Sequence, residues 1–111
     1  MKWQKLSNER GLLLGLGTLL RFSAGYPFEG EVVMMVCDSP PESRLKLALM
    51  TITGCKAGRN CFLAFPDSAH NEEGWLTADW LYDNWRHWVW PEGNPDDVFI
   101  LPGGLSANDL K

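Results

Sequence analysis

The sequence has few of the side chains that build metal sites or disulfide frameworks. Its 111 residues include three cysteines, Cys37, Cys55 and Cys61, and two histidines, His70 and His87. No two cysteines form a C-x-x-C pair, so the spacing does not match a zinc-site signature and we expect no metal. Cys55 and Cys61 flank the turn KAGRN and could face each other across a hairpin. Reduced thiols fit a cytosolic protein better, so we expect three thiols and keep a Cys55–Cys61 bridge as the alternative.

The sequence also lacks a hydrophobic run long enough to cross a membrane. The run GLLLGLGTLL covers residues 11–20, whereas a transmembrane helix needs about 20 apolar residues. With the lysines before it, this run loosely resembles a signal peptide. However, Glu9 lies in the supposed positive region and Arg21 interrupts the approach to a cleavage site. We therefore expect a cytoplasmic protein with no membrane partner.

Motifs for nucleotide binding and catalysis are absent as well. The G-x-G of residues 15–17 lacks the third glycine of a dinucleotide fingerprint, and no strand–helix unit follows it. None of the serines has the context of a nucleophile elbow. His70, with Asp67, Glu72 and Glu73 around it, could support acid–base chemistry or bind a metal. Such polar residues between proline and glycine are more typical of a solvated loop, so we predict no enzyme activity and no cofactor.

The residues that are present indicate one small globular domain spanning residues 1–111. Hydrophobic residues make up 45% and charged residues 22% of the chain, which is typical of a soluble protein. Short apolar or alternating runs are separated by turn-forming residues, and they predict strands at residues 18–22, 31–37, 45–53, 61–65 and 98–101. We predict an α+β fold, in which a small antiparallel sheet of four to five strands packs against one Trp-rich amphipathic helix.

That helix is predicted from a concentrated run of tryptophans. Five of the six tryptophans lie within sixteen residues, from Trp75 to Trp90. Thr77 is a suitable N-cap, and Pro91 ends the helix because proline disfavours helical backbone in the residue before it. At about 100° per residue, one apolar stripe is formed by Ala78, Leu81, Tyr82, Trp85, Trp88 and Val89.

Two tryptophans on this stripe are expected to anchor the core. We predict that Trp85 and Trp88 are almost fully buried against the sheet. Their expected contacts are strand residues such as Val33, Met35, Leu47 or Leu49.

Trp80 does not fit the stripe and falls on the polar side of the helix, near His87. A tryptophan in that position is either covered by another segment, such as the loop that carries Trp75, or exposed as a binding anchor. Trp90 closes the helix and could be buried or exposed.

Charge is unevenly distributed along the chain. Residues 1–64 have a balance of +3, whereas residues 65–111 have a balance of −7. An acidic half disfavours nucleic acid, because phosphate binding needs the opposite sign, and it attracts a basic protein partner. We therefore predict a partner-binding surface within residues 67–97, although acidic loops can also serve solubility alone. Its predicted residues are Trp80, Asp79, Asp83, Glu72, Glu73, Asp96 and Asp97.

Three stretches of the chain carry a family resemblance. They are ITGCKAGRNCFLAFP (residues 52–66), EGWLTADWLYDNWRHWVWPEG (residues 73–93) and the acidic NPDDVFIL after them; TLLRF and YPFEGEVVMMV, nearer the N-terminus, add to it. They resemble bacterial immunity proteins of polymorphic toxin systems, and specifically the immunity protein 45 family. The resemblance implies a cytosolic protein that binds and neutralises a cognate toxin domain delivered by a neighbouring cell. The shared motifs are structural and provide no catalytic residues.

The sequence thus predicts an immunity-type binding protein that occludes a toxin domain, of which a basic nuclease is one fitting class. The first alternative is a small enzyme or ligand-binding protein with a pocket lined by Trp75, Trp80 and His87. The second is a structural adaptor in a larger assembly. A concave pocket with convergent polar groups would favour the first alternative.

Overall fold

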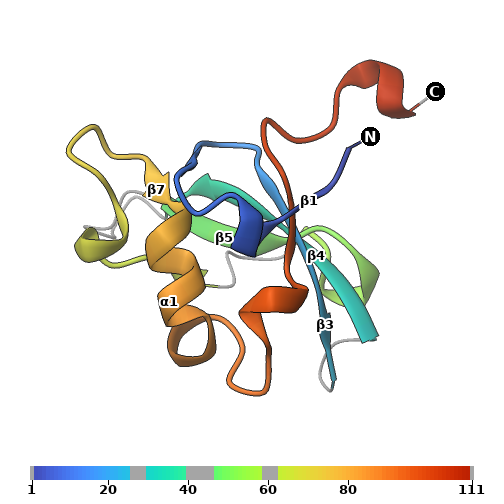
Figure 1. The fold of residues 1–111 in the computed structure, drawn as a ribbon. Helices are drawn as coiled ribbons and strands as arrows, with labels where there is room; N and C mark the ends of the chain where they lie inside the picture. Colours follow the sequence, from blue (N-terminus) through green and yellow to red (C-terminus); the bar gives the residue numbers. More distant parts are fainter. Residues whose placement is uncertain (1, 26–29, 40–46, 59–62, 111) are drawn as a thin grey trace.

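Residues 2–25, 30–39, 47–58 and 63–110 are described by the computed structural model of the protein (Figure 1). Six strands form one antiparallel sheet in the order β1-β8-β3-β4-β5-β6. Their bounds are β1 (Gln4–Lys5), β8 (Phe99–Leu101), β3 (Leu19–Ala24), β4 (Gly30–Asp38), β5 (Leu47–Thr51) and β6 (Leu63–Ala64). Two more strands, β2 (Leu13–Leu14) and β7 (Leu76–Thr77), pair antiparallel as a separate two-stranded sheet.

The α+β class is confirmed, but the predicted number of strands was too low. The five predicted strands appear as β3, β4, β5, β6 and β8, with shifted ends. The prediction missed β1, β2 and β7, each of which has two residues. Two residues cannot show an alternating pattern, and β1 and β2 pair with strands remote in the sequence. Tertiary contacts rather than local sequence therefore determine these three strands.

Alternation along β4 shows which face of the sheet carries the core. Val32, Met34 and Val36 are buried in the main hydrophobic cluster, whereas Val33 and Met35 lie on the opposite face and are only half-buried. The expectation that Val33 and Met35 pack against the helix was therefore wrong. An apolar run with valine or methionine at every position does not reveal which alternate set faces inward.

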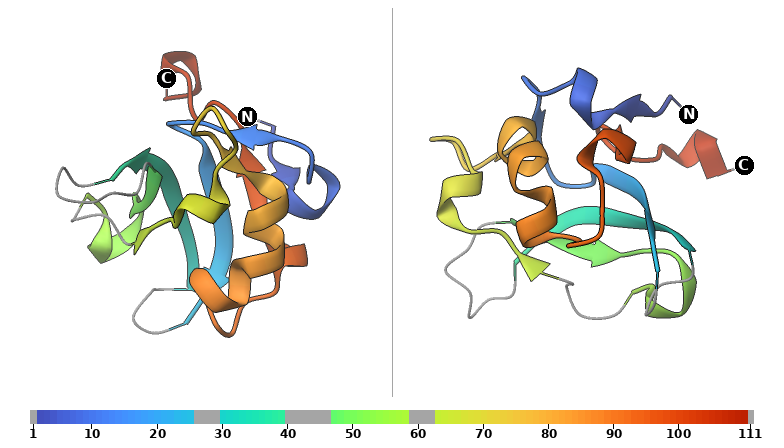
Figure 2. Two further views of the ribbon diagram at one scale, coloured as in Figure 1. Left: turned by 90° about the vertical axis from the view of Figure 1, so that its left-hand side faces the viewer. Right: turned by 60° about the horizontal axis from the view of Figure 1, so that its bottom comes forward.

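The predicted helix is present as α1 (Ala78–Trp88), which lies against one face of the twisted sheet (Figure 2). Thr77 is its N-cap as predicted, and the Thr77 hydroxyl accepts a hydrogen bond from the Trp80 N–H at 3.3 Å. The helix ends at Trp88, before the stop predicted at Pro91. The remaining helical segments are single 3₁₀ turns: η1 (Leu6–Asn8), η2 (Gly54–Lys56), η3 (Asp67–Ala69), η4 (Pro95–Asp97) and η5 (Ala107–Leu110).

The two tryptophans predicted to anchor the core differ in how deeply they are buried. Trp85 is 1% exposed, and its ring meets Phe22 edge to face with 4.8 Å between ring centroids. Leu47 and Leu49 belong to the same core cluster. Trp88 is 40% exposed, so its predicted burial was wrong. It lies at the edge of the apolar stripe, where burial depends on which segment packs beside the helix.

The opposite face of the sheet contains an arginine between two aromatic rings. The Arg21 guanidinium lies 4.6 Å from the ring centroid of Trp3 and 4.9 Å from that of Phe99. Phe99 is the register partner of Arg21 across the β3–β8 ladder. These contacts hold the short strands at this edge through cation–π attraction and stem packing.

The structure describes only one of the three cysteine side chains that the predictions concern. Cys37 is half-buried on β4. Cys61 and the side chain of Cys55 lie outside the described residues. Both the expectation of three thiols and the alternative bridge therefore stay predictions.

Candidate partner-binding surface

Two of the predicted acidic residues are held by an arginine from the N-terminal segment. Arg10 donates through Nε to an Asp79 carboxylate oxygen at 2.6 Å and through a terminal nitrogen to Asp83 at 2.7 Å. Its guanidinium also lies 4.4 Å from the ring centroid of Tyr82. The hydrogen bond to Asp79 is the main cause that raises the pKa of Arg10 above its ordinary value. All of these groups are at the surface, so their contribution to stability is small.

Tyr82 extends this group to a third predicted residue. Its hydroxyl donates to an Asp96 carboxylate oxygen at 2.6 Å, and this hydrogen bond is the main cause that raises the pKa of Tyr82. Asp97 follows in η4 and is exposed. We call Arg10, Asp79, Tyr82, Asp83 and Asp96 the Arg10 cluster.

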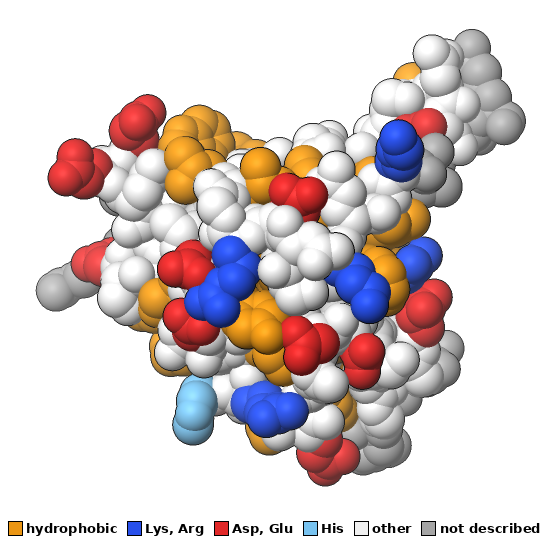
Figure 3. Space-filling model, in the orientation of Figure 1, with side chains coloured by type: hydrophobic (Ala, Val, Ile, Leu, Met, Phe, Trp, Pro, Cys, Tyr) orange, Lys and Arg blue, Asp and Glu red, His pale blue; other side chains and the backbone are white. Residues whose placement is uncertain are grey.

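The surface around α1 is not uniformly acidic. Figure 3 shows Lys and Arg side chains among Asp and Glu side chains on the face that includes the helix. Arg10 comes from the half of the sequence with positive balance, yet it lies between carboxylates from the negative half. The two halves of the charge distribution therefore interleave in space.

The other two predicted carboxylates lie in a tight turn just before β7. The Asn71 side-chain oxygen accepts hydrogen bonds from the backbone N–H groups of Glu73 at 3.0 Å and Trp75 at 2.9 Å. The Asn71 backbone N–H donates to the Trp75 carbonyl at 2.9 Å, and Gly74 supplies a positive φ of 89°. This turn presents the exposed side chains of Glu72 and Glu73 from a hydrogen-bonded backbone.

Trp75 follows these carboxylates and lies over Gly15. A Cβ atom added at Gly15 would approach the six-membered ring of Trp75 to 2.8 Å, so only glycine allows the ring to lie there. Trp75 is 41% exposed, and Leu13 and Leu16, on either side of Gly15, are 49% and 51% exposed. Figure 3 shows hydrophobic side chains gathered in this region, with acidic side chains beside them. We call Leu13, Leu16 and Trp75, with Glu72 and Glu73, the Trp75 patch.

The β2–β7 pairing explains why these residues share a face. Leu14 pairs with Leu76, and both side chains are fully buried. Leu13 pairs with Thr77, and the same register places Gly15 opposite Trp75. Because side chains alternate along a strand, Leu13 and Trp75 point away from the core. The sequence prediction included Glu72 and Glu73 but missed Leu13 and Leu16, because no local signal predicts this pairing.

Trp80 is half-buried rather than fully exposed. Its ring meets Phe65 edge to face at 6.0 Å and Trp88 at 5.9 Å. Of the two alternatives for Trp80, these contacts give partial cover, and they place Phe65 rather than the Trp75 loop beside it. Trp90 is also half-buried and packs against the core.

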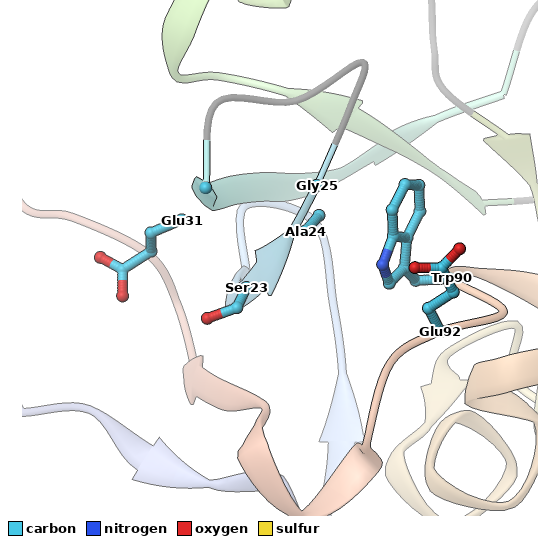
Figure 4. Close-up of a pocket in the computed structure, with 7 residues that line it drawn as sticks. Ser23, Ala24, Gly25, Glu31, Trp90 and Glu92 are labelled. Carbon is cyan, nitrogen blue, oxygen red and sulfur yellow. The ribbon is translucent and has the colours of Figure 1, made fainter.

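A shallow cavity of about 430 Å³ lies between the ends of β3 and β4 and the turn after α1. Trp90 and Glu92 lie opposite Ala24 across it, whereas the Ser23 hydroxyl and the Glu31 carboxylate point away (Figure 4). Neither Trp75, Trp80 nor His87 is among its described lining residues. The Trp-lined pocket of the alternative prediction is thus not this cavity.

His70 is held by the backbone of its own loop. Its Nδ1 lies 3.0 Å from the Pro66 carbonyl oxygen, and its ring is half-buried. Among the described residues, no group of three or more His, Cys, Asp or Glu side chains is arranged to hold a metal ion. In the same part of the chain, no helix has the length and hydropathy needed to span a membrane.

Comparison with known protein families identifies the family of the chain. The model of the family described as immunity protein 45 matches residues 6–100. The chain belongs to this family. The matched range contains α1, the Arg10 cluster and the Trp75 patch. The family resemblance predicted from the sequence is therefore confirmed. No curated protein and no solved structure matched the chain.

Proposed function

We propose that this protein binds a cognate bacterial toxin domain in the cytoplasm of the producing cell and neutralises it by covering its active surface. Membership of the immunity protein 45 family is the observation that carries this proposal. The role needs a stable protein surface and no chemistry of its own. No enzyme activity is therefore part of the proposal.

The charge of the chain supports a basic partner. The net charge is −4, and the predicted binding residues lie in the half with a balance of −7. Such a surface attracts a basic protein domain over several ångströms and speeds encounter at low ionic strength. A nuclease is a fitting toxin class, because a domain that binds phosphate carries the complementary charge.

Growth rescue and binding together test the proposal. A toxin domain found in a gene adjacent to that of this protein is expressed with and without the protein, and the two purified proteins are mixed and passed over a size-exclusion column. We expect restored growth and co-elution of the two chains. If the neighbouring domain is toxic but is neither bound nor suppressed, the proposed function is wrong.

A salt series tests the electrostatic part. Association with the toxin domain should slow markedly as ionic strength rises, because long-range attraction is screened within about 10 Å at 0.1 M salt. A salt-independent association rate would contradict a basic partner while leaving neutralisation itself intact.

A further inference from the structure

Resting on the proposed function, we propose that the toxin domain docks on the Trp75 patch and places an arginine or lysine side chain over the Trp75 indole, with its charge at Glu72 and Glu73. The Arg10 cluster then lies outside the contact centre. This narrows the predicted acidic surface to one described site with one kind of occupant.

The first argument is the pairing state of the carboxylates. Asp79 and Asp83 accept hydrogen bonds from Arg10, and Asp96 accepts one from Tyr82. No described side chain forms a hydrogen bond or ion pair with the carboxylate of Glu72 or Glu73. A partner cation at the Arg10 cluster must compete with an existing guanidinium, whereas one at Glu72 and Glu73 meets carboxylates that no described side chain pairs.

The second argument is the exposed apolar surface beside this charge. Leu13, Leu16 and Trp75 are three of the five most exposed large hydrophobic side chains among the described residues. Aromatic anchors surrounded by charged residues are typical of protein interfaces. The cation–π attraction of tryptophan and the carboxylates select the same ligand, a side chain with a long apolar stem and a positive end.

The third argument is that the site is already ordered. Asn71 fixes the backbone of Glu73 and Trp75 through two hydrogen bonds, and Gly15 provides the flat seat for the indole. Binding therefore has little backbone entropy to remove in this turn. The β2–β7 pairing links this seat to the buried Leu14 and Leu76.

Tryptophan truncation gives the first test, with Trp88 as a matched control. Trp88 is 40% exposed and Trp75 is 41% exposed, so both substitutions remove a tryptophan with a similar exposed fraction. Binding of Trp75→Ala and Trp88→Ala to the neighbouring toxin domain is followed by stopped flow. We expect Trp75→Ala to speed dissociation by about 10- to 100-fold and Trp88→Ala by less than about twofold.

Charge reversal gives the second test and separates contact from long-range attraction. Glu73→Lys and Asp97→Lys change the net charge equally, and both side chains are exposed. Both should slow association at low salt, because the long-range field weakens equally. Only Glu73→Lys should also speed dissociation, by about 10-fold or more. Thermal melts of all four variants verify that each is folded.

These outcomes separate the docking site from the function. If the wild-type protein binds and protects while Trp75→Ala and Glu73→Lys dissociate at the wild-type rate, the docking site is wrong and neutralisation stands. If Asp97→Lys speeds dissociation as much as Glu73→Lys, the contact centre is not the Trp75 patch. If the wild-type protein binds no toxin domain, both proposals fall.

Discussion

Trp85 and Trp75 belong to the same tryptophan-rich run, but their surroundings differ. Trp85 lies in the core against Phe22, whereas Trp75 lies on Gly15 at the surface, near the carboxylates of Glu72 and Glu73, which no described side chain pairs. The same side chain therefore serves stability in one place and, as proposed, recognition in the other. The neighbours supplied by remote segments decide between the two roles, and mutations at the two sites should separate them.

Trp85→Ala should produce the largest loss of stability in this comparison. Removing a fully buried indole leaves a cavity among Phe22 and the leucines of the core. We expect the free energy of unfolding to fall by about 3–5 kcal/mol. Denaturant unfolding of this variant and of Trp75→Ala, carried out in parallel, measures the loss in each. A loss from Trp85→Ala no larger than that from Trp75→Ala would contradict the assigned core role.

Gly93→Ala should have the next largest effect, because Gly93 covers Trp85. A Cβ atom at this position would lie 2.7 Å from Trp85 Nε1 and 3.2 Å from the Trp90 carbonyl oxygen. We expect a loss of about 1–3 kcal/mol from overpacking. Gly11→Ala is the matched control, because an added Cβ there meets no atom within 4 Å. Equal stability of the two variants would show that the Gly93 contact relaxes without cost.

The sequence predicted the elements that have a clear local pattern. Thr77 and the apolar stripe were sufficient to place α1 and to bury Trp85. Trp88 was misplaced because it lies at the edge of that stripe, where only Trp80 among the described aromatic contacts packs on it. Periodicity gives the direction of the core but not the width of the covered arc.

The candidate site was predicted less completely, for a related reason. Glu72 and Glu73 were included because of their charge, but the leucines beside Trp75 were not. The β2–β7 pairing that assembles them joins residues far apart in the chain. Arg10 shows the same limit, because its place between Asp79 and Asp83 cannot be inferred from the charge balance of the two halves.

Trp88→Ala should cost less than either core substitution. Its ring is partly exposed and meets Trp80 edge to face. An aromatic pair of this kind contributes about 0.5–1.5 kcal/mol beyond its buried area, so we expect a loss of about 1–2 kcal/mol. The Trp80→Ala, Trp88→Ala double-mutant cycle in denaturant measures the coupling directly. Strictly additive losses would show that the two rings do not stabilise each other.

The smallest expected effect concerns the hydrogen bond between Tyr82 and Asp96 in the Arg10 cluster. The bond favours the protonated phenol, which raises the pKa of Tyr82 above its ordinary value of about 10. A raised pKa in the folded state gives stability that is fully present below the unfolded pKa and is lost as pH rises through the folded pKa. Asp96→Ala should therefore lower the pKa of Tyr82, cost a small amount of stability at neutral pH, where this contribution is fully present, and weaken the loss of stability as pH rises through the pKa of Tyr82.

Ultraviolet titration of the tyrosines measures that pKa, with Tyr82→Phe to assign the signal. Thermal melts at neutral and alkaline pH measure the linked stability. Both groups are at the surface, so the midpoint at neutral pH should move little. An unchanged Tyr82 pKa in Asp96→Ala would contradict the hydrogen bond. A large loss of stability at neutral pH would instead show that the Arg10 cluster is a structural element comparable to the core around Trp85, and the contrast between the two regions would then disappear.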